Sequence, residues 1–158
     1  MPRPIHATSK KRPSLTTTVD KKTLVDAGPI IALLIGADRH HAWARDAWGQ
    51  LAPPVFTCEA VLAEAQYVVK RLGGNPLAVL KFLHKGAIQV AFSLEPEIER
   101  LLELQRSYAD VPMSLADACL VRMTELYQHS RVMTTDSDFR IYRRNRRQVI
   151  PLLAPPEI

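Results

Sequence analysis

Short apolar runs alternate along the chain with longer stretches in which apolar positions recur at helical spacing. The short runs predict strands over residues 23–26, 55–57, 88–92, 132–135 and 149–153. The stretches between them predict helices over residues 30–35, 41–51, 59–72, 75–85, 95–109 and 114–129. Short strands that alternate with helices are typical of a parallel sheet with both faces covered. The pattern therefore predicts an α/β fold, a three-layer α/β/α sandwich with a short central parallel sheet.

Residues 1–20 depart from this pattern, because they lack apolar periodicity and contain three prolines. We expect a basic, disordered N-terminal arm over residues 1–21, one folded domain over 22–154 and a short C-terminal tail over 155–158. The longest apolar run, residues 27–37, is too short to cross a bilayer, and no secretory signal follows the basic start. Only two cysteines occur in the 158 residues, which favours a reduced, cytoplasmic protein.

The net charge of +5 is spread unevenly. Residues 1–22 hold six Lys or Arg against one Asp, and residues 140–158 hold five Arg against one Glu. The stretch between them has ten basic and fourteen acidic side chains, so an acidic body lies between two basic ends. Such a body can hold cations while the basic ends attract a polyanion.

Four acids fall where the predicted sheet would bring them together. Asp26 and Asp136 follow strands, Asp117 lies in the first turn of a helix, and Glu64 lies in the second turn of another. The carboxyl ends of parallel strands share one edge of the sheet, where functional groups collect. Clustered carboxylates repel one another unless a cation lies between them, and oxygen ligands favour Mg²⁺ or Mn²⁺. Such ions can activate water for attack on a phosphodiester.

Each of these acids also has a purely structural interpretation. Asp26 can act as a turn or N-cap residue. Asp117 stands three positions after Ser114, which is the spacing of a capping box. Glu64 can be a solvated helix residue, and Asp136 and Asp138 can stabilise a turn.

The acids lie in four short motifs, Thr23-Leu-Val-Asp26, Glu59-Ala-Val-Leu-Ala-Glu64, Ser114-Leu-Ala-Asp117-Ala and Thr134-Thr-Asp136-Ser-Asp138-Phe139. In their order and spacing these motifs resemble the successive acidic motifs of PIN domains, and the nearest branch resembles the VapC-type toxins of bacterial toxin–antitoxin pairs. The resemblance covers residues 22–154.

The resemblance implies a Rossmann-like fold and a metal-dependent site that cleaves single-stranded RNA. It assigns Asp26, Glu64, Asp117 and Asp136 to catalysis and metal binding, with Asp138 as a further metal ligand. It also implies a homodimer and a small antitoxin partner. PIN domains commonly carry Ser or Thr shortly after the first Asp, whereas Ala27 and Gly28 follow Asp26 here.

The arginine segment after Asp138 places positive charge beside the predicted acidic edge, so we expect Arg140, Arg143 and Arg144 to contact RNA. A solvated basic loop explains the same residues. The leading hypothesis is an Mg²⁺- or Mn²⁺-dependent endoribonuclease that acts as the toxin of a type II toxin–antitoxin pair. Two alternatives stay open, a PIN-fold module that binds RNA or protein with little or no catalysis, and a structure-specific DNA nuclease.

Overall fold

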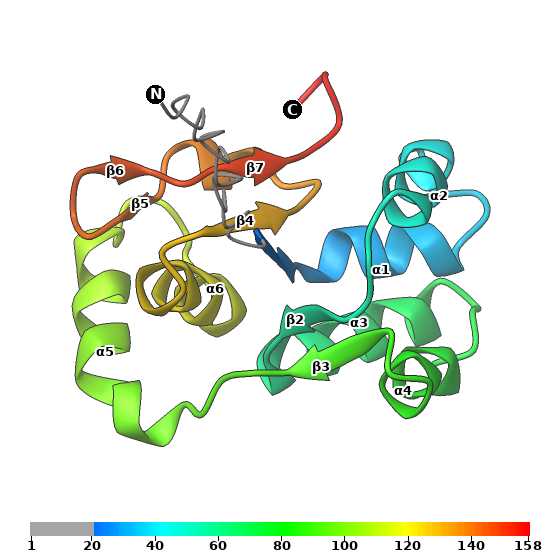
Figure 1. The fold of residues 1–158 in the computed structure, drawn as a ribbon, viewed down its shortest axis with the longest axis horizontal. Coiled ribbons are helices and arrows are strands. Elements are labelled where there is room, and N and C mark those ends of the chain that lie inside the picture. The colour runs from blue at the N-terminus through cyan, green and yellow to red at the C-terminus, as the bar shows by residue number, and fades with distance from the viewer. Residues whose placement is uncertain (1–20) are drawn as a thin grey trace, which may run out of the picture.

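The computed structural model describes residues 21–158, so the predicted arm lies outside the described residues except for Lys21. Five strands form one parallel sheet in the order β3-β2-β1-β4-β7 (Figure 1). Their bounds are β1 Lys22–Val25, β2 Val55–Thr57, β3 Ile88–Val90, β4 Ser130–Met133 and β7 Leu152–Leu153. Leu24 of the central strand β1 is in register with Phe56 of β2 and Val132 of β4. Leu24 and Val25 are fully buried, as expected for a strand covered on both faces.

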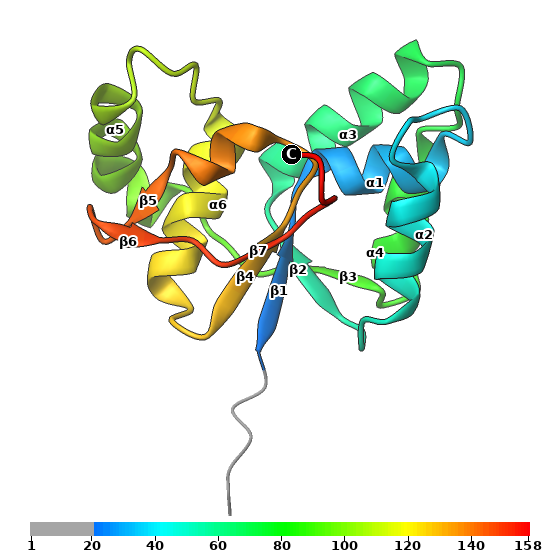
Figure 2. The ribbon, with the colours of Figure 1, turned by 90° about the horizontal axis from the view of Figure 1, so that it is seen from above.

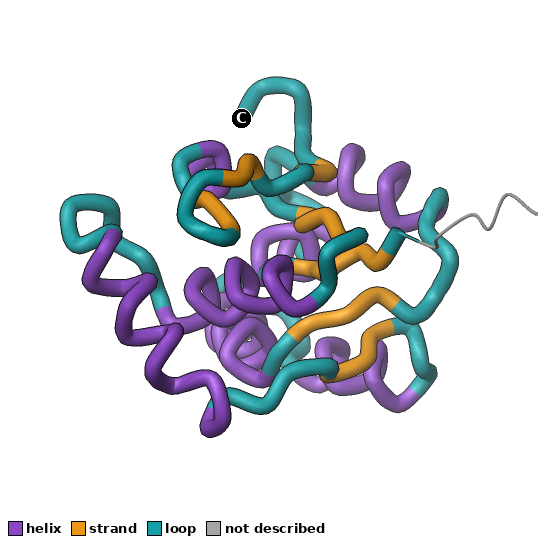
Figure 3. The backbone as a smooth tube through the Cα atoms, turned by 60° about the vertical axis from the view of Figure 1, so that its left-hand side comes forward, coloured by secondary structure: helices purple, strands orange, loops and turns teal. Residues whose placement is uncertain are grey.

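Helices cover both faces of this sheet. Figure 2 shows α1 to α4 on one side of the strands and α5 and α6 on the other, and Figure 3 shows the strands as the inner layer. The helix bounds are α1 Ala27–Leu34, α2 His41–Gly49, α3 Glu59–Arg71, α4 Leu77–His84, α5 Ile98–Ser107 and α6 Leu115–Leu126. The predicted three-layer sandwich with a central parallel sheet is confirmed.

The sheet has a point where the direction of winding reverses. From β1 the chain continues to β2 and β3 on one side, and it then returns to place β4 on the other side of β1. In open α/β sheets ligands bind in the crevice outside the carboxyl ends of the strands at such a switch point. The carboxyl ends of β1 and β4 are therefore the place where the fold favours a functional site.

The C-terminal part of the chain differs from the prediction. The single strand expected over residues 149–153 is wrong, because Gln148–Val149 (β6) pairs with Arg143–Arg144 (β5) in a separate antiparallel hairpin. Only Leu152–Leu153 joins the main sheet, beside β4. Ile150 and Pro151 lie between the two strands, and Pro151 has no N–H to extend a ladder.

Smaller differences concern helix ends. The helix expected over residues 95–109 begins as a 3₁₀ turn, Glu95–Glu97, and continues as α5.

The last residues of the chain pack against the domain, since Pro155 is buried and Glu157 Oε1 lies 3.0 Å from His40 Nδ1. Within residues 21–158, no helix combines the length and the apolar character that crossing a bilayer requires.

Candidate active site

Asp26 lies at the switch point, where β1 ends and α1 begins. It is the N-cap of α1, and its Oδ1 accepts a hydrogen bond from the Ala27 N–H at 2.7 Å. Its Oδ2 accepts a second one from the Thr134 hydroxyl at the end of β4, also at 2.7 Å. Asp26 is only 6% exposed. Burial, with smaller contributions from the charges of Asp117 and Glu64, raises the pKa of Asp26 from 3.8 to about 7.

Asp117 enters the site from the start of α6. Ser114 and Asp117 form the predicted capping box, in which the Asp117 N–H donates to Ser114 Oγ and the Ser114 N–H donates to Asp117 Oδ2. The Tyr142 hydroxyl donates to the same Oδ2 at 3.3 Å, and no hydrogen bond from residues 21–158 reaches Oδ1. Burial raises the pKa of Asp117, and the Asp136 charge adds to the rise. Capping therefore uses one carboxylate oxygen and leaves the other for a ligand.

Glu64 and Asp136 complete the set. Asp136 caps the 3₁₀ turn Ser137–Arg140, with its Oδ1 accepting from the Asp138 N–H at 2.9 Å. Glu64 projects from the exposed side of α3. Partial desolvation raises the pKa of Glu64, and the charges of Asp117 and Asp136 raise it further. The charge of Asp136 therefore acts on Glu64 and Asp117, and the charges of Glu64 and Asp117 act on Asp26.

Asp138 lies two residues after Asp136 in the same 3₁₀ turn. Burial raises the pKa of Tyr142, and the charges of Asp117 and Asp138 raise it further. No group of three or more His, Cys, Asp or Glu side chains in residues 21–158 is arranged closely enough to hold an ion as it stands. The donor set nevertheless fits a hard cation, because every predicted ligand is a carboxylate oxygen. Burial is the largest cause of the raised pKa values of Asp26, Glu64 and Asp117, and the neighbouring carboxylate charges add to it.

Gly28 allows the two strand ends to approach each other. A Cβ at this position would overlap the Thr135 hydroxyl oxygen and would lie 3.3 Å from Thr135 Cβ. The absence of a side chain at Gly28 thus lets the end of β4 lie against the first turn of α1. This close approach brings Thr134 within reach of Asp26.

Sequence reasoning missed Thr134 and Tyr142. PIN domains commonly carry a hydroxyl residue shortly after the first Asp, and Ala27 and Gly28 lack one. The structure supplies a hydroxyl to Asp26 from Thr134, which follows the neighbouring strand β4. The pair Thr134-Thr135 in front of Asp136 was the available signal. Tyr142 gave no signal, because its contact with Asp117 depends on how the chain folds back after β4.

The three arginines that were predicted to contact RNA differ in their exposure and their hydrogen bonds. Arg140 is exposed. Arg143 donates through Nη1 to the carbonyl oxygens of residues 140, 141 and 142, and Arg144 donates to Gln128 O at 2.9 Å near the end of α6. Arg143 and Arg144 therefore hold neighbouring backbone segments in place, and the contact of all three arginines with RNA stays a prediction.

Comparison with known proteins agrees with this architecture. The family model described as the PIN domain matches residues 23–145. Ribonuclease VapC26 of Mycobacterium tuberculosis (strain ATCC 25618 / H37Rv) is 29% identical over 115 residues, which cover 72% of this chain and 85% of that protein. The crystal structure of Mycobacterium tuberculosis VapC20, described as a sarcin-ricin loop cleaving toxin, superposes with a TM-score of 0.68 at 20% identity. That match covers 74% of this chain and 92% of VapC20 and demonstrates a shared fold. Because the family model spans most of the chain, including all four acids, this protein belongs to the PIN domain family.

Proposed function

We propose that this chain is a divalent-metal-dependent endoribonuclease that cleaves single-stranded RNA, with residues 22–154 as the nuclease domain. The observation that carries the proposal is the placement of acids at the switch point of the sheet, where the Thr134 hydroxyl joins Asp26 to the backbone of Asp136. The charges of Asp117 and Glu64 lie close enough to add to the rise in the pKa of Asp26. Its support from relatives is the likeness to Ribonuclease VapC26.

The four acids, with Asp138 at the margin, are the residues that would hold Mg²⁺ or Mn²⁺. Such an ion supplies an activated water and stabilises the charge that develops on the phosphodiester. The chain's own contribution is to position the ligands. Thr134 orients one Asp26 oxygen, and Ser114 and Tyr142 orient one Asp117 oxygen. Fixed hydrogen bonds of this kind keep ligand carboxylates in place before any ion arrives.

Substitution of single acids tests this proposal. We expect Asp26→Asn and Asp117→Asn each to lower cleavage of a single-stranded RNA with Mn²⁺ by at least about 100-fold. Asp46→Asn, which removes an exposed carboxylate on α2, is the matched control and should keep wild-type activity. Cleavage at the wild-type rate by either variant would show that the substituted residue has no part in the mechanism. Cleavage that persists in EDTA would show that the reaction does not depend on a metal. DNA and duplex substrates of the same sequence decide whether RNA is the preferred polymer.

A second function is a PIN-fold module that grips RNA or protein without cutting it. The lack of a preassembled group of three metal-binding side chains in residues 21–158 favours this alternative. Calorimetric titration with Mn²⁺ separates the two functions, since a purely binding module should take up no metal at millimolar concentration.

We further propose that the protein is a cytoplasmic toxin that forms a homodimer and is inhibited by a small antitoxin. The likeness to VapC20, a toxin by its description, supports this role. Light scattering on the purified protein should give twice the mass of 17.7 kDa. A small protein encoded beside this one should abolish RNA cleavage when it is added. A monomer, or cleavage that the neighbouring protein leaves unchanged, would contradict this part of the proposal.

A further inference from the structure

A basic cavity lies outside the acidic edge, between α5 and the β5–β6 hairpin. It has a volume of about 490 Å³ and is lined by α5, Tyr108 and the hairpin. Its charged lining residues are Arg100, Arg106, Arg143, Arg146 and Glu103. Within residues 21–158, only Arg100 of these four arginines is paired with carboxylates, so the other three leave the cavity with an excess of positive charge that suits an anion.

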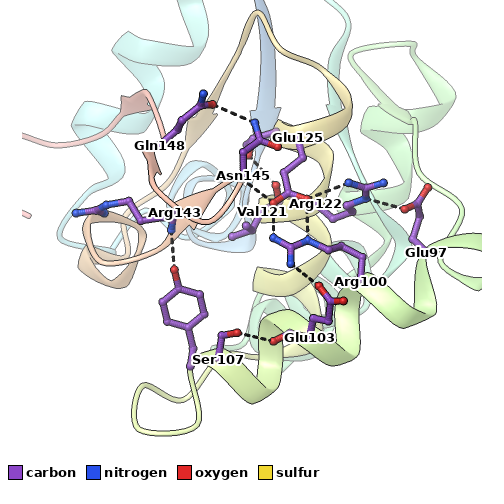
Figure 4. A network of polar contacts seen from close by, with 12 residues as sticks. Glu97, Arg100, Glu103, Ser107, Val121, Arg122, Glu125, Arg143, Asn145 and Gln148 are labelled. Atoms are coloured by element: carbon purple, nitrogen blue, oxygen red, sulfur yellow. Dashed lines mark hydrogen bonds and ion pairs between the residues drawn. The ribbon is translucent and has the colours of Figure 1, made fainter.

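Two of these arginines are already engaged by protein groups. Arg100 donates to Glu103 and, through two bonds of 2.7 and 3.0 Å, to the buried side chain of Glu125 (Figure 4). Arg143 donates through Nη1 to backbone carbonyls, and its N–H donates to the Tyr108 hydroxyl at 2.9 Å. These contacts build a rigid wall for the cavity.

The other two arginines are available for a ligand. Arg106 and Arg146 are exposed, and neither forms an ion pair or side-chain hydrogen bond with another residue in the range 21–158. Arg106 comes from the last turn of α5 and Arg146 comes from the tip of the hairpin. They therefore bring two guanidinium groups to the cavity from separate elements.

The backbone at the hairpin tip is a second, independent observation. Asn145 and Arg146 have φ values of 48° and 69°, in the left-handed region where glycine is favoured. The strained turn is held by the Asn145 N–H, which donates to Glu125 Oε1 at 2.9 Å, and by the Asn145 amide, which donates to Gln148 at 3.0 Å (Figure 4). Arginine in place of the favoured glycine costs stability and places a cation at the cavity, which is a pattern that marks functional sites.

The cavity and the acidic edge share a wall. Tyr108, which lines the cavity, packs edge-on against Tyr142 with ring centroids 5.1 Å apart. The Tyr142 hydroxyl in turn donates to Asp117. Tyr142 is fully buried, so it connects the two sites from beneath, while the partly exposed Tyr108 lies beside the cavity. A strand with one phosphate at the acidic edge can therefore bring another phosphate to the arginines by passing Tyr108.

We propose that this cavity binds a backbone phosphate of the single-stranded RNA, close along the strand to the phosphate that is cleaved. Arg106 and Arg146 hold the phosphate oxygens, while Arg143, which is paired with no carboxylate within residues 21–158, adds positive charge behind them. The inference rests on the proposed function and extends it, because it gives the substrate strand a direction across the surface, from the acidic edge past Tyr108 to the hairpin.

Binding of a labelled single-stranded RNA, measured by fluorescence anisotropy in EDTA over a salt series, tests the proposal. We expect Arg106→Gln and Arg146→Gly each to weaken binding about five- to tenfold and to reduce the slope of log affinity against log salt by about 0.7. The double variant Arg45→Gln/Lys81→Gln is the control. It removes two exposed cations from α2 and α4, at the far end of the molecule in Figure 1, and should bind like wild type.

Arg146→Gly has an additional value, because glycine suits the left-handed backbone. We expect its Tm to match or exceed that of wild type while its RNA affinity falls, so that weaker binding cannot be blamed on unfolding. With Mn²⁺, both cavity variants should raise KM and leave kcat unchanged. Wild-type affinity and salt slope in both variants would overturn the cavity and leave the nuclease proposal standing. No RNA binding by the wild-type chain at low salt would overturn both.

Discussion

The Thr134 hydroxyl is the contact that joins the two strand ends of the site. It donates to Asp26 Oδ2, and its oxygen accepts the Asp136 N–H at 3.0 Å. One buried side chain thus orients the acid that follows β1 and fixes the backbone of another acid beyond β4. Hydrogen bonds to an ionised group are stronger than those between neutral groups, so Thr134 stabilises the charged form of Asp26.

Replacing Thr134 by valine keeps the shape and removes the hydroxyl. We expect Thr134→Val to lower the free energy of unfolding by about 1.5–3 kcal/mol and RNA cleavage by about 10- to 100-fold. Thr134→Ser should restore most of both. These changes are measured by chemical denaturation and by initial cleavage rates.

Thr124→Val is the matched control. Thr124 is also fully buried, and its hydroxyl donates to Val121 O within α6, away from the acids. Thr124→Val should lower the free energy of unfolding by about 1 kcal/mol and leave RNA cleavage unchanged. Equal activities in the Thr134→Val and Thr124→Val proteins would show that the Thr134 hydroxyl has no part in the site.

Among the elements, strands β1 to β4 and the helices were predictable from hydrophobic periodicity, because both faces of the sheet are buried. The β5–β6 hairpin was not predictable. Its strands, Arg143–Arg144 and Gln148–Val149, are two residues long and mostly polar, and its turn lacks the glycine that signals such turns. The hairpin is held instead by Glu125 on α6, a contact that only the folded chain provides.

The junction of β1 and α1 gives the prediction that belongs to elements. Alanine normally stabilises a helix relative to glycine by about 1 kcal/mol, but at Gly28 its methyl group would overlap Thr135. We expect Gly28→Ala to lower the free energy of unfolding by about 1–3 kcal/mol and to reduce RNA cleavage, because the end of β4 must shift.

The double variant Gly28→Ala/Thr135→Ala should recover part of this loss, as a double-mutant cycle in chemical denaturation would show. Gly49→Ala is the control, because Gly49 ends α2 and a Cβ there meets no atom within 4 Å. Equal stability changes for Gly28→Ala and Gly49→Ala would mean that the close approach at Gly28 does not constrain the site.

In the whole molecule, the positions of the acids were predictable and their geometry was not. Asp26, Asp117 and Asp136 could be placed at one edge because strand ends and helix starts of a parallel sheet meet there. The buried partners of these acids, Thr134 and Tyr142, come from segments whose approach depends on the packing of β4 and the chain after it. The basic cavity was not predictable either. Its arginines lie far apart in the sequence, and the packing of Tyr108 against Tyr142 brings their segments together.

The raised pKa of Asp26 has a consequence for stability. Between pH 4 and 7, the folded metal-free protein keeps a proton on Asp26 that the unfolded chain has released, because the pKa is about 7 in one state and 3.8 in the other. The Asp26 contribution to stability therefore falls as pH rises through this window. Asp26→Asn should remove that part of the slope, and a bound cation should reverse it.

Calorimetric titration of the wild-type protein with Mn²⁺ at pH 7, in two buffers of different ionisation enthalpy, tests the central claim that the four acids share a cation. We predict saturable binding that releases about half a proton per ion, because a carboxyl with a pKa near 7 is half protonated there. Asp26→Asn should weaken the binding and abolish the proton release, while Asp46→Asn should change neither. No heat of binding at millimolar Mn²⁺, or equal binding and proton release in wild type and Asp26→Asn, would contradict the account.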